Sequence, residues 1–91
     1  MTSANHKLRL RESALTWREI AGEIVAADLA RSTYLSTNAA GTLLWSALVE
    51  GASSEELAAR LVTQYRIERT QAEADVAAFL GALRENGLLE E

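Results

Sequence analysis

The chain has 91 residues, enough for one small domain, and its formal net charge is −4. It contains no cysteine, which excludes disulfides, zinc–thiolate sites and a thiol nucleophile. Lys7 is its single lysine, which argues against a nucleic-acid-binding surface, because such a surface needs clustered lysine and arginine.

The residues before position 37 include short segments that alternate between apolar and polar side chains, which is the period of a half-buried strand. The first predicted strand covers the alternating residues 8–11 and 15–18, the second 23–27 and the third 33–36, with a turn at 21–22. Strands joined so closely are expected to be antiparallel neighbours. The polar residues 1–7 are expected to form a flexible N-terminus before a single domain of residues 8–91.

After position 37 the pattern changes to that of helices. Asn38 is the predicted N-cap of a first helix, and Gly51 is placed to end it. Ser53 and Glu56 have the spacing of a capping box, in which each side chain accepts a hydrogen bond from the other residue's backbone amide. This pair predicts the start of a second helix.

A second pair with the same spacing, Thr70 and Glu73, predicts the start of the longest helix. We expect this helix to end just before Gly87, with Leu88 and Leu89 folding back against its last turn. The predicted order is three strands followed by three helices. This order indicates an α+β, winged-helix-like fold with a three-stranded antiparallel sheet followed by three helices.

One flank of the third predicted helix carries small side chains. At about 100° per residue, its core-facing residues are Ala72, Val76, Phe79, Leu80 and Leu83. The residues on the flank are Asp75, Ala78, Ala82 and Asn86. Small side chains at these positions predict a shallow apolar trough beside Phe79 and Leu83. The alternative is that the alanines are there because alanine is the best helix former.

The third predicted strand, residues 33–36, has no charged residue and no proline. Soluble proteins usually protect an edge strand with one or the other. An unprotected edge beside an apolar trough suits strand addition, in which a peptide backbone pairs with the edge and alternate side chains enter the trough. The strand therefore predicts a peptide-binding site rather than a catalytic one.

No residue pattern is typical of a catalytic, cofactor or metal site. His6 is the single histidine and lies in the polar N-terminus, so a transition-metal site would need carboxylates alone. No serine is in the context of an activated nucleophile. We therefore expect neither an enzyme nor a cofactor. No stretch approaches the roughly 20 apolar residues that span a bilayer and no signal peptide is present, so we expect a soluble, cytoplasmic protein.

Two other functions remain open. A winged-helix DNA-binding transcriptional regulator would share this architecture, but it would need arginine and lysine gathered on a recognition helix. The arginines of the last two predicted helices are scattered among acidic residues. A small hydrolase would need a nucleophile with a base beside it, and the sequence indicates no such pair.

An ordered set of residues leads from the third predicted strand to the C-terminus. Its members are Tyr34-Leu35, Asn38-Ala39-Ala40, Trp45, Glu56-Leu57, Tyr65, Asp75-Val76, Phe79-Leu80, Leu83 and Gly87-Leu88. This set resembles the PqqD-like peptide chaperones, also called the recognition elements for ribosomally made precursor peptides, over roughly residues 8–90. Two features depart from the family pattern. Thr37 stands where leucine is frequent, and the connection at 28–32 lacks the usual glycine.

The resemblance implies a non-catalytic protein that binds the leader segment of a precursor peptide between the third strand and the third helix. It would then present the precursor to a separate enzyme. A free-standing chain of this length is similar to the leader-binding protein of split lasso-peptide systems, whose partner is a transglutaminase-like leader peptidase. Maturation of a quinone cofactor would instead imply a radical-SAM partner. We expect a monomer or a weak edge-strand dimer that contacts neither nucleic acid nor membrane. The expected peptide-binding residues are Arg31, Ser32, Thr33, Tyr34, Leu35, Ser36, Asp75, Ala78, Phe79, Ala82, Leu83 and Asn86.

Overall fold

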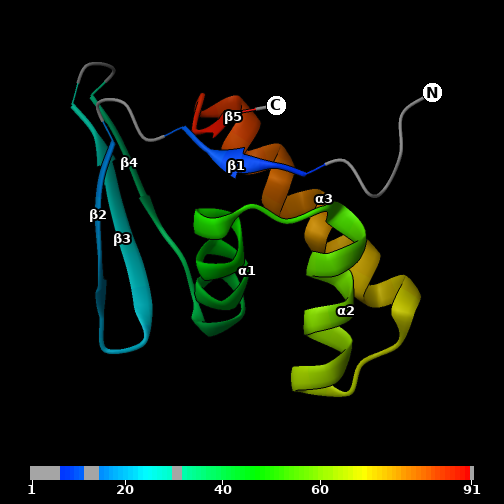
Figure 1. Ribbon diagram of the computed structural model, residues 1–91. Helices are drawn as coiled ribbons and strands as arrows, with labels where there is room; N and C mark the ends of the chain where they lie inside the picture. Colours follow the sequence, from blue (N-terminus) through cyan, green and yellow to red (C-terminus); the bar gives the residue numbers. More distant parts are fainter. Residues whose placement is uncertain (1–6, 12–14, 30–31, 91) are drawn as a thin grey trace.

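The structure is a computed structural model that describes residues 7–11, 15–29 and 32–90 (Figure 1). Its elements are β1 (Arg9–Leu10), β2 (Leu15–Ile20), β3 (Glu23–Asp28), β4 (Thr33–Ser36), α1 (Ala39–Glu50), α2 (Ser54–Tyr65), α3 (Arg69–Glu85) and β5 (Leu89–Glu90). The sheet of β2, β3 and β4 stands on one side, and the helices lie on the other. Of the expected flexible N-terminus, residues 1–6 lie outside the described part of the chain. No helix in the described part is long and apolar enough to cross a membrane.

The strands β2, β3 and β4 form one antiparallel sheet in that order. Ala26 of β3 pairs with Trp17 of β2 and with Leu35 of β4. Ala21 and Gly22 join β2 to β3 with φ values of 53° and 82°, the left-handed conformation that suits a two-residue hairpin turn. A three-stranded antiparallel sheet is therefore followed by three helices, and the predicted α+β fold is confirmed.

The prediction that residues 8–11 belong to this sheet is wrong. They contain β1, which pairs with β5 at the other end of the chain and places Leu10 opposite Leu89. Leu8 and Leu10 are 5% and 3% exposed, so burial of both side chains against the helices decides where this segment lies. The short strand β5 was not predicted.

The C-terminal end of α3 makes the connection to β5. Gly87 has a φ of 68°, and its amide donates to the Arg84 carbonyl oxygen at 3.0 Å. The Leu88 amide donates to the Leu83 carbonyl oxygen at 2.9 Å. These two bonds form a Schellman motif, in which a left-handed glycine turns the chain back over the last helical turn. Leu88 is thereby buried, as predicted.

The caps predicted for the first two helices are confirmed. The Asn38 side chain accepts a hydrogen bond from the Gly41 amide at 2.9 Å and begins α1. Gly51 ends this helix with a φ of 99°. Both hydrogen bonds of the capping box between Ser53 and Glu56 are present at the start of α2.

The prediction that Thr70 caps the third helix is wrong. α3 already begins at Arg69, and Glu68 is its N-cap residue without a side-chain cap. The chain turns early because Arg66 adopts a left-handed φ of 55° directly after α2. Thr70 therefore lies within the first helical turn, and the Glu73 carboxylate accepts a hydrogen bond from the Arg69 guanidinium at 3.2 Å.

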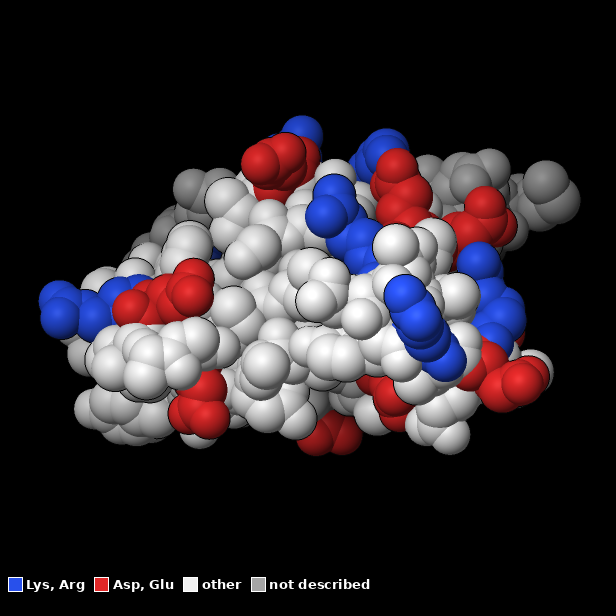
Figure 2. Space-filling model, turned by 90° about the horizontal axis from the view of Figure 1, so that it is seen from below, with Lys and Arg blue, Asp and Glu red and all other residues white. Residues whose placement is uncertain are grey.

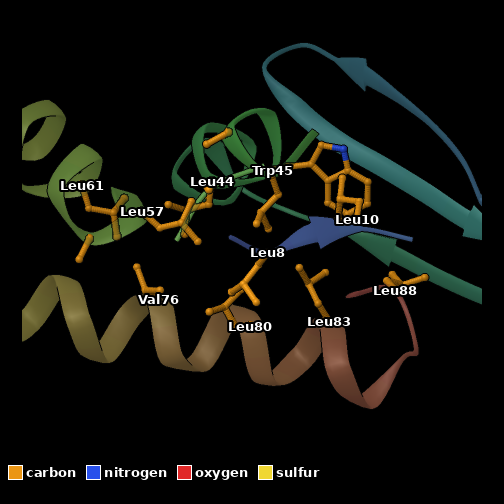
Figure 3. Packing of buried hydrophobic residues seen from close by; sticks show 14 of the residues in the cluster. Leu8, Leu10, Leu44, Trp45, Leu57, Leu61, Val76, Leu80, Leu83 and Leu88 are labelled. Atoms are coloured by element: carbon orange, nitrogen blue, oxygen red, sulfur yellow. The ribbon is translucent and has the colours of Figure 1, made fainter. Parts of the chain in front are cut away.

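The core lies between the three helices, β1 and the inner face of the sheet (Figure 3). Trp45 is fully buried in it. The second tryptophan, Trp17, is 39% exposed and lies at the rim, where its ring meets Trp45 edge to face with centroids 5.7 Å apart. Leucines from β1, α1, α2 and α3 converge around this centre.

Candidate functional site

β4 is an edge strand, because β3 pairs with one of its sides and no described segment pairs with the other. The Thr37 amide donates to the Ile24 carbonyl oxygen at 2.9 Å, so these residues form a hydrogen-bonded pair. Bonded and non-bonded pairs alternate along an antiparallel ladder, so Leu35 also bonds to β3. The amide and carbonyl groups of Tyr34 and Ser36 then point to the open side. This side offers two donors and two acceptors to an added strand.

A cleft of about 430 Å³ lies beside this edge, between the end of β4, the first turn of α1 and α3. Its lining residues are Leu35, Ser36, Thr37, Asn38, Ala40, Gly41, Leu44, Leu61, Asp75, Ala78, Phe79, Ala82 and Leu83. Most of them are apolar or small. Leu35 reaches the cleft because its side chain is on the inner face of the sheet, on the same side as the buried Ala26.

The cleft brings together most of the residues predicted from the sequence. Those that line it are Leu35, Ser36, Asp75, Ala78, Phe79, Ala82 and Leu83. The predicted residues that do not line it are Ser32, Thr33, Tyr34 and Asn86. Arg31 lies outside the described residues. β4 and α3, which the sequence analysis predicted to form one site together, therefore face each other across one depression.

The predicted residues outside the lining have local reasons for their positions. Tyr34 is 72% exposed because its side chain is on the outer face of the sheet, although its backbone is on the open edge. Ser32 lies in the turn before β4 with a left-handed φ of 53°. The Asn86 side chain donates to the Ala82 carbonyl oxygen at 2.8 Å and closes the end of α3.

The wall that α1 contributes was not predicted. Asn38, Ala40 and Gly41 of its first turn line the cleft together with Thr37. Gly41 is needed there, because a Cβ at this position would lie 2.6 Å from the Thr37 Cβ. The run of small residues directly after the N-cap was the signal in the sequence that could have revealed this wall.

The spacing between the sheet and α3 is held by Arg11. Its guanidinium Nη2 donates to the Asp28 carboxylate at 2.8 Å, and its Nε donates to the Gly87 carbonyl oxygen at 2.6 Å. Asp28 is the last residue of β3 and is 1% exposed. One side chain therefore ties the strand that neighbours β4 to the residue that follows α3, which fixes the two sides of the cleft relative to each other.

Among the described residues that line the cleft, Asp75 is the one that is charged. Its carboxylate accepts a hydrogen bond from the Gln71 side chain at 2.8 Å, and the side chain remains exposed at the mouth. Seen from below, where the first turn of α1 faces the viewer, Figure 2 shows a continuous uncharged surface at the centre of the molecule, with Lys and Arg side chains above it and to its right.

One carboxylate with a lowered pKa, Glu56, lies outside the cleft. A hydrogen bond from Lys7, followed by one from the Ser53 backbone amide, lowers the pKa of Glu56 from 4.5 to about 2. This carboxylate belongs to the cap of α2 and does not line the cleft. In the described part of the chain, no group of histidine and carboxylate side chains could hold a metal ion.

Comparisons with known proteins point to one family. Residues 23–89 match the PqqD family, described as coenzyme PQQ synthesis protein D. A solved structure described as TbiB1 in complex with the TbiA(beta) leader peptide is 33% identical, with a TM-score of 0.82, and the match covers 90% of this chain and 94% of that one. Another, described as lasso peptide synthetase B1 complexed with the leader peptide, is 31% identical with a TM-score of 0.80, covering 92% and 98%. The comparison with curated proteins gives no significant match.

Proposed function

The chain belongs to the PqqD family, and from this premise we propose that it binds the leader segment of a ribosomally made precursor peptide as an added strand. The observation that carries the proposal is the open edge of β4 directly beside an apolar cleft. An extended peptide pairs its backbone with Tyr34 and Ser36 on this edge. α3 is the opposite wall, so the peptide lies between β4 and α3.

The geometry of an added strand defines the kind of peptide that fits. Successive side chains of a strand point to opposite faces, so every second side chain of the leader is on the same face as Leu35. These side chains enter the cleft and contact Leu35, Phe79 and Leu83, which line it. The intervening side chains point outwards, as Tyr34 does. The backbone bonds give affinity with little dependence on sequence, and the apolar side chains at alternate positions give selectivity.

Asp75 adds a polar preference at the mouth of the cleft. Its carboxylate is exposed and accepts one hydrogen bond from Gln71, so its remaining lone pairs can accept others. A lysine, an arginine or another donor on the leader at this point would form a charge-assisted hydrogen bond. We expect this contact to orient the peptide more than to tighten its binding, because an exposed ion pair contributes little.

The proposed role is non-catalytic. The described residues that line the cleft include a single carboxylate and no nucleophile with a base beside it, which suits binding rather than bond breaking. The protein would hold the leader while a separate enzyme acts on the precursor. The descriptions of the two similar structures favour lasso-peptide biosynthesis, and there a transglutaminase-like leader peptidase is the proposed recipient.

A backbone-amide NMR titration of the labelled protein tests the proposal. The probe is a synthetic leader segment of the cognate precursor peptide, and a short DNA duplex is added to a second sample. We expect the leader alone to shift amides in residues 32–41 and 75–86, and the duplex to shift none. Shifts with the duplex, or none with the leader, would refute the leader-binding function.

A further inference from the structure

The two walls of the cleft pack against different parts of the molecule. The sheet packs against α1 through β3, whereas α3 packs against α2 and β5. At Ser36 the chain continues directly into the start of α1, so this end of β4 is joined to the helices by the chain itself. The other end, at Thr33, follows the turn from β3. The distance between that end of β4 and α3 is therefore set by contacts through space.

Hydrogen bonds of the Arg11 side chain connect this end of the sheet to α3. Thr33 pairs with Asp28 of β3, and the Asp28 carboxylate accepts a hydrogen bond from Arg11 Nη2 at 2.8 Å. Arg11 Nε donates to the Gly87 carbonyl oxygen at 2.6 Å. We call Arg11, Asp28 and Gly87 the Arg11 clasp. It lies outside the lining of the cleft.

The backbone carries the connection on to the cleft wall. The Arg11 amide donates to the Leu88 carbonyl oxygen at 2.8 Å, and the Leu88 amide donates to the Leu83 carbonyl oxygen at 2.9 Å. Leu83 lines the cleft. The end of β4 and the last turns of α3 are therefore joined by an unbroken series of paired groups, which is the kind of contiguous network that can carry energetic coupling.

The chemistry of the clasp makes its geometry specific. The side chain of Asp28 is 1% exposed and that of Arg11 is 29% exposed, so opening the clasp would leave a buried carboxylate without its cation. A guanidinium donates from several nitrogens held in one rigid plane, so it can fix the separation of two acceptors that belong to different elements. The ammonium of lysine keeps the charge but donates from a single atom on a flexible stem.

We propose that Arg11 is a positioning residue for leader binding, which holds β4 and α3 at the separation that one added strand needs. This inference rests on the proposed leader-binding function and names the contact that forms the site before the leader arrives. Without the clasp the separation varies, and the apparent affinity falls with the fraction of molecules whose cleft is competent. A bound leader contacts both walls, so the leader and the clasp stabilise the same arrangement.

Calorimetric titrations with a synthetic leader segment of the cognate precursor test the effect on affinity. The variant is Arg11→Lys, and the matched control is Arg9→Lys at an exposed position of β1. We expect Arg11→Lys to bind about fivefold more weakly, as it would with about one fifth of the molecules competent, and Arg9→Lys to bind like the wild type. Asp28→Asn tests the same bond from the sheet side and should change affinity in the same direction. Thermal unfolding defines a temperature at which every variant is folded.

A distance measurement separates positioning from a general loss of stability. The chain has no cysteine, so Val25→Cys on β3 and Glu85→Cys on α3 introduce one pair of spin labels at exposed sites outside the cleft. With Arg11 in place, we expect a narrow distance distribution with or without the leader. Arg11→Lys should broaden the distribution of the free protein, and saturating leader should narrow it again.

The outcomes distinguish this inference from the function on which it rests. If the wild type binds the leader and folded Arg11→Lys binds as tightly as Arg9→Lys, the positioning role is refuted and the proposed function stands. A fall in affinity without broadening of the distance distribution refutes the positioning role as well, since the separation of the walls would not have changed. If the wild type binds no leader, both the function and the positioning role are refuted.

Discussion

α3 has depressions of similar size on two sides, and their chemistry differs. The cleft beside β4 has a volume of about 430 Å³ and one charged lining residue. The depression between α2 and α3, which we call the charged groove, has a volume of about 380 Å³. Its lining residues are Ser54, Glu55, Arg69, Glu73, Val76, Ala77, Leu80 and Arg84. Volume alone therefore does not distinguish a binding site on this helix.

The neighbouring element makes the difference. The charged groove is flanked by the first turn of α2, which offers no strand edge, and the ion pair between Arg69 and Glu73 lies across its surface. The cleft is flanked by β4, whose Tyr34 and Ser36 present backbone groups on a side where no described strand pairs with them. An extended peptide can therefore pair as an added strand on the β4 side and not in the charged groove. In the proposed function, the alanines of α3 therefore contribute to binding on the side where a strand edge faces them.

The largest expected effect is on leader affinity, when an arginine is introduced on one side of α3 or on the other. Ala82→Arg introduces a guanidinium into the apolar cleft and blocks the space for the leader side chains. We expect leader affinity, measured by calorimetry, to fall more than about 100-fold. Ala77→Arg places the same side chain in the charged groove and should change affinity less than about twofold.

Thermal unfolding serves as the control for this pair, since both variants must be folded for the comparison to count. Ala77 is exposed and Ala82 is partly exposed, so both substitutions should leave the melting temperature nearly unchanged. If a folded Ala82→Arg variant binds the leader as tightly as Ala77→Arg does, the two sides of α3 are equivalent and the cleft is not the site.

A second comparison uses one substitution at two helical glycines. Gly41→Ala should destabilise the protein by about 1–3 kcal/mol, because the new methyl group would lie 2.6 Å from the Thr37 Cβ in the wall of the cleft. Gly81→Ala, at a helical position with no atom within 4 Å of the new methyl group, should instead stabilise it by about 0.5–1 kcal/mol. Urea unfolding measures both changes. A gain of stability at Gly41 would show that the packing of α1 against Thr37 is looser than the structure indicates.

Proline removes a single backbone amide donor, so a proline substitution can test which amides of β4 point to its open side. Tyr34→Pro deletes a donor that points to the open side of β4, so the sheet keeps its bonds to β3 while an added strand loses one. We expect leader affinity to fall about three- to tenfold, which corresponds to one net hydrogen bond. Tyr34→Ala retains the amide and should bind as the wild type does, because this side chain points away from the cleft. Equal affinity of the two variants would contradict strand addition at this residue.

Much of the fold and of the cleft could be predicted because local signals were strong. Asn38, the capping box of Ser53 and Glu56, and the left-handed glycine after α3 each define a helix end through a specific hydrogen bond. The spacing of Ala78 and Ala82 placed one face of α3 in the cleft, since helical periodicity is independent of tertiary contacts.

The features that were missed depend on contacts between distant parts of the chain. β1 pairs with β5 because Leu8 and Leu10 are buried against the helices, and alternation in sequence does not reveal which strand is the partner. The start of α3 was misplaced because Arg66 takes a left-handed turn that its residue type disfavours. The wall formed by α1 escaped notice because the sequence does not show that Gly41 lies against Thr37.

The smallest expected effect is on the stability of the protein at acid pH. It tests whether the charged N-terminal end of α2 contributes to folding and not to leader binding. Because folding lowers the pKa of Glu56 from 4.5 to about 2, its stabilising contribution is fully present above about pH 4.5 and is lost as the pH falls through about 2. Glu56→Gln should therefore flatten the pH dependence of the unfolding free energy in this interval and leave leader affinity at neutral pH unchanged. Urea unfolding at a series of pH values measures this dependence. Glu55→Gln, at an adjacent exposed carboxylate, should keep the wild-type slope, and equal slopes in the two variants would assign the effect to other carboxylates.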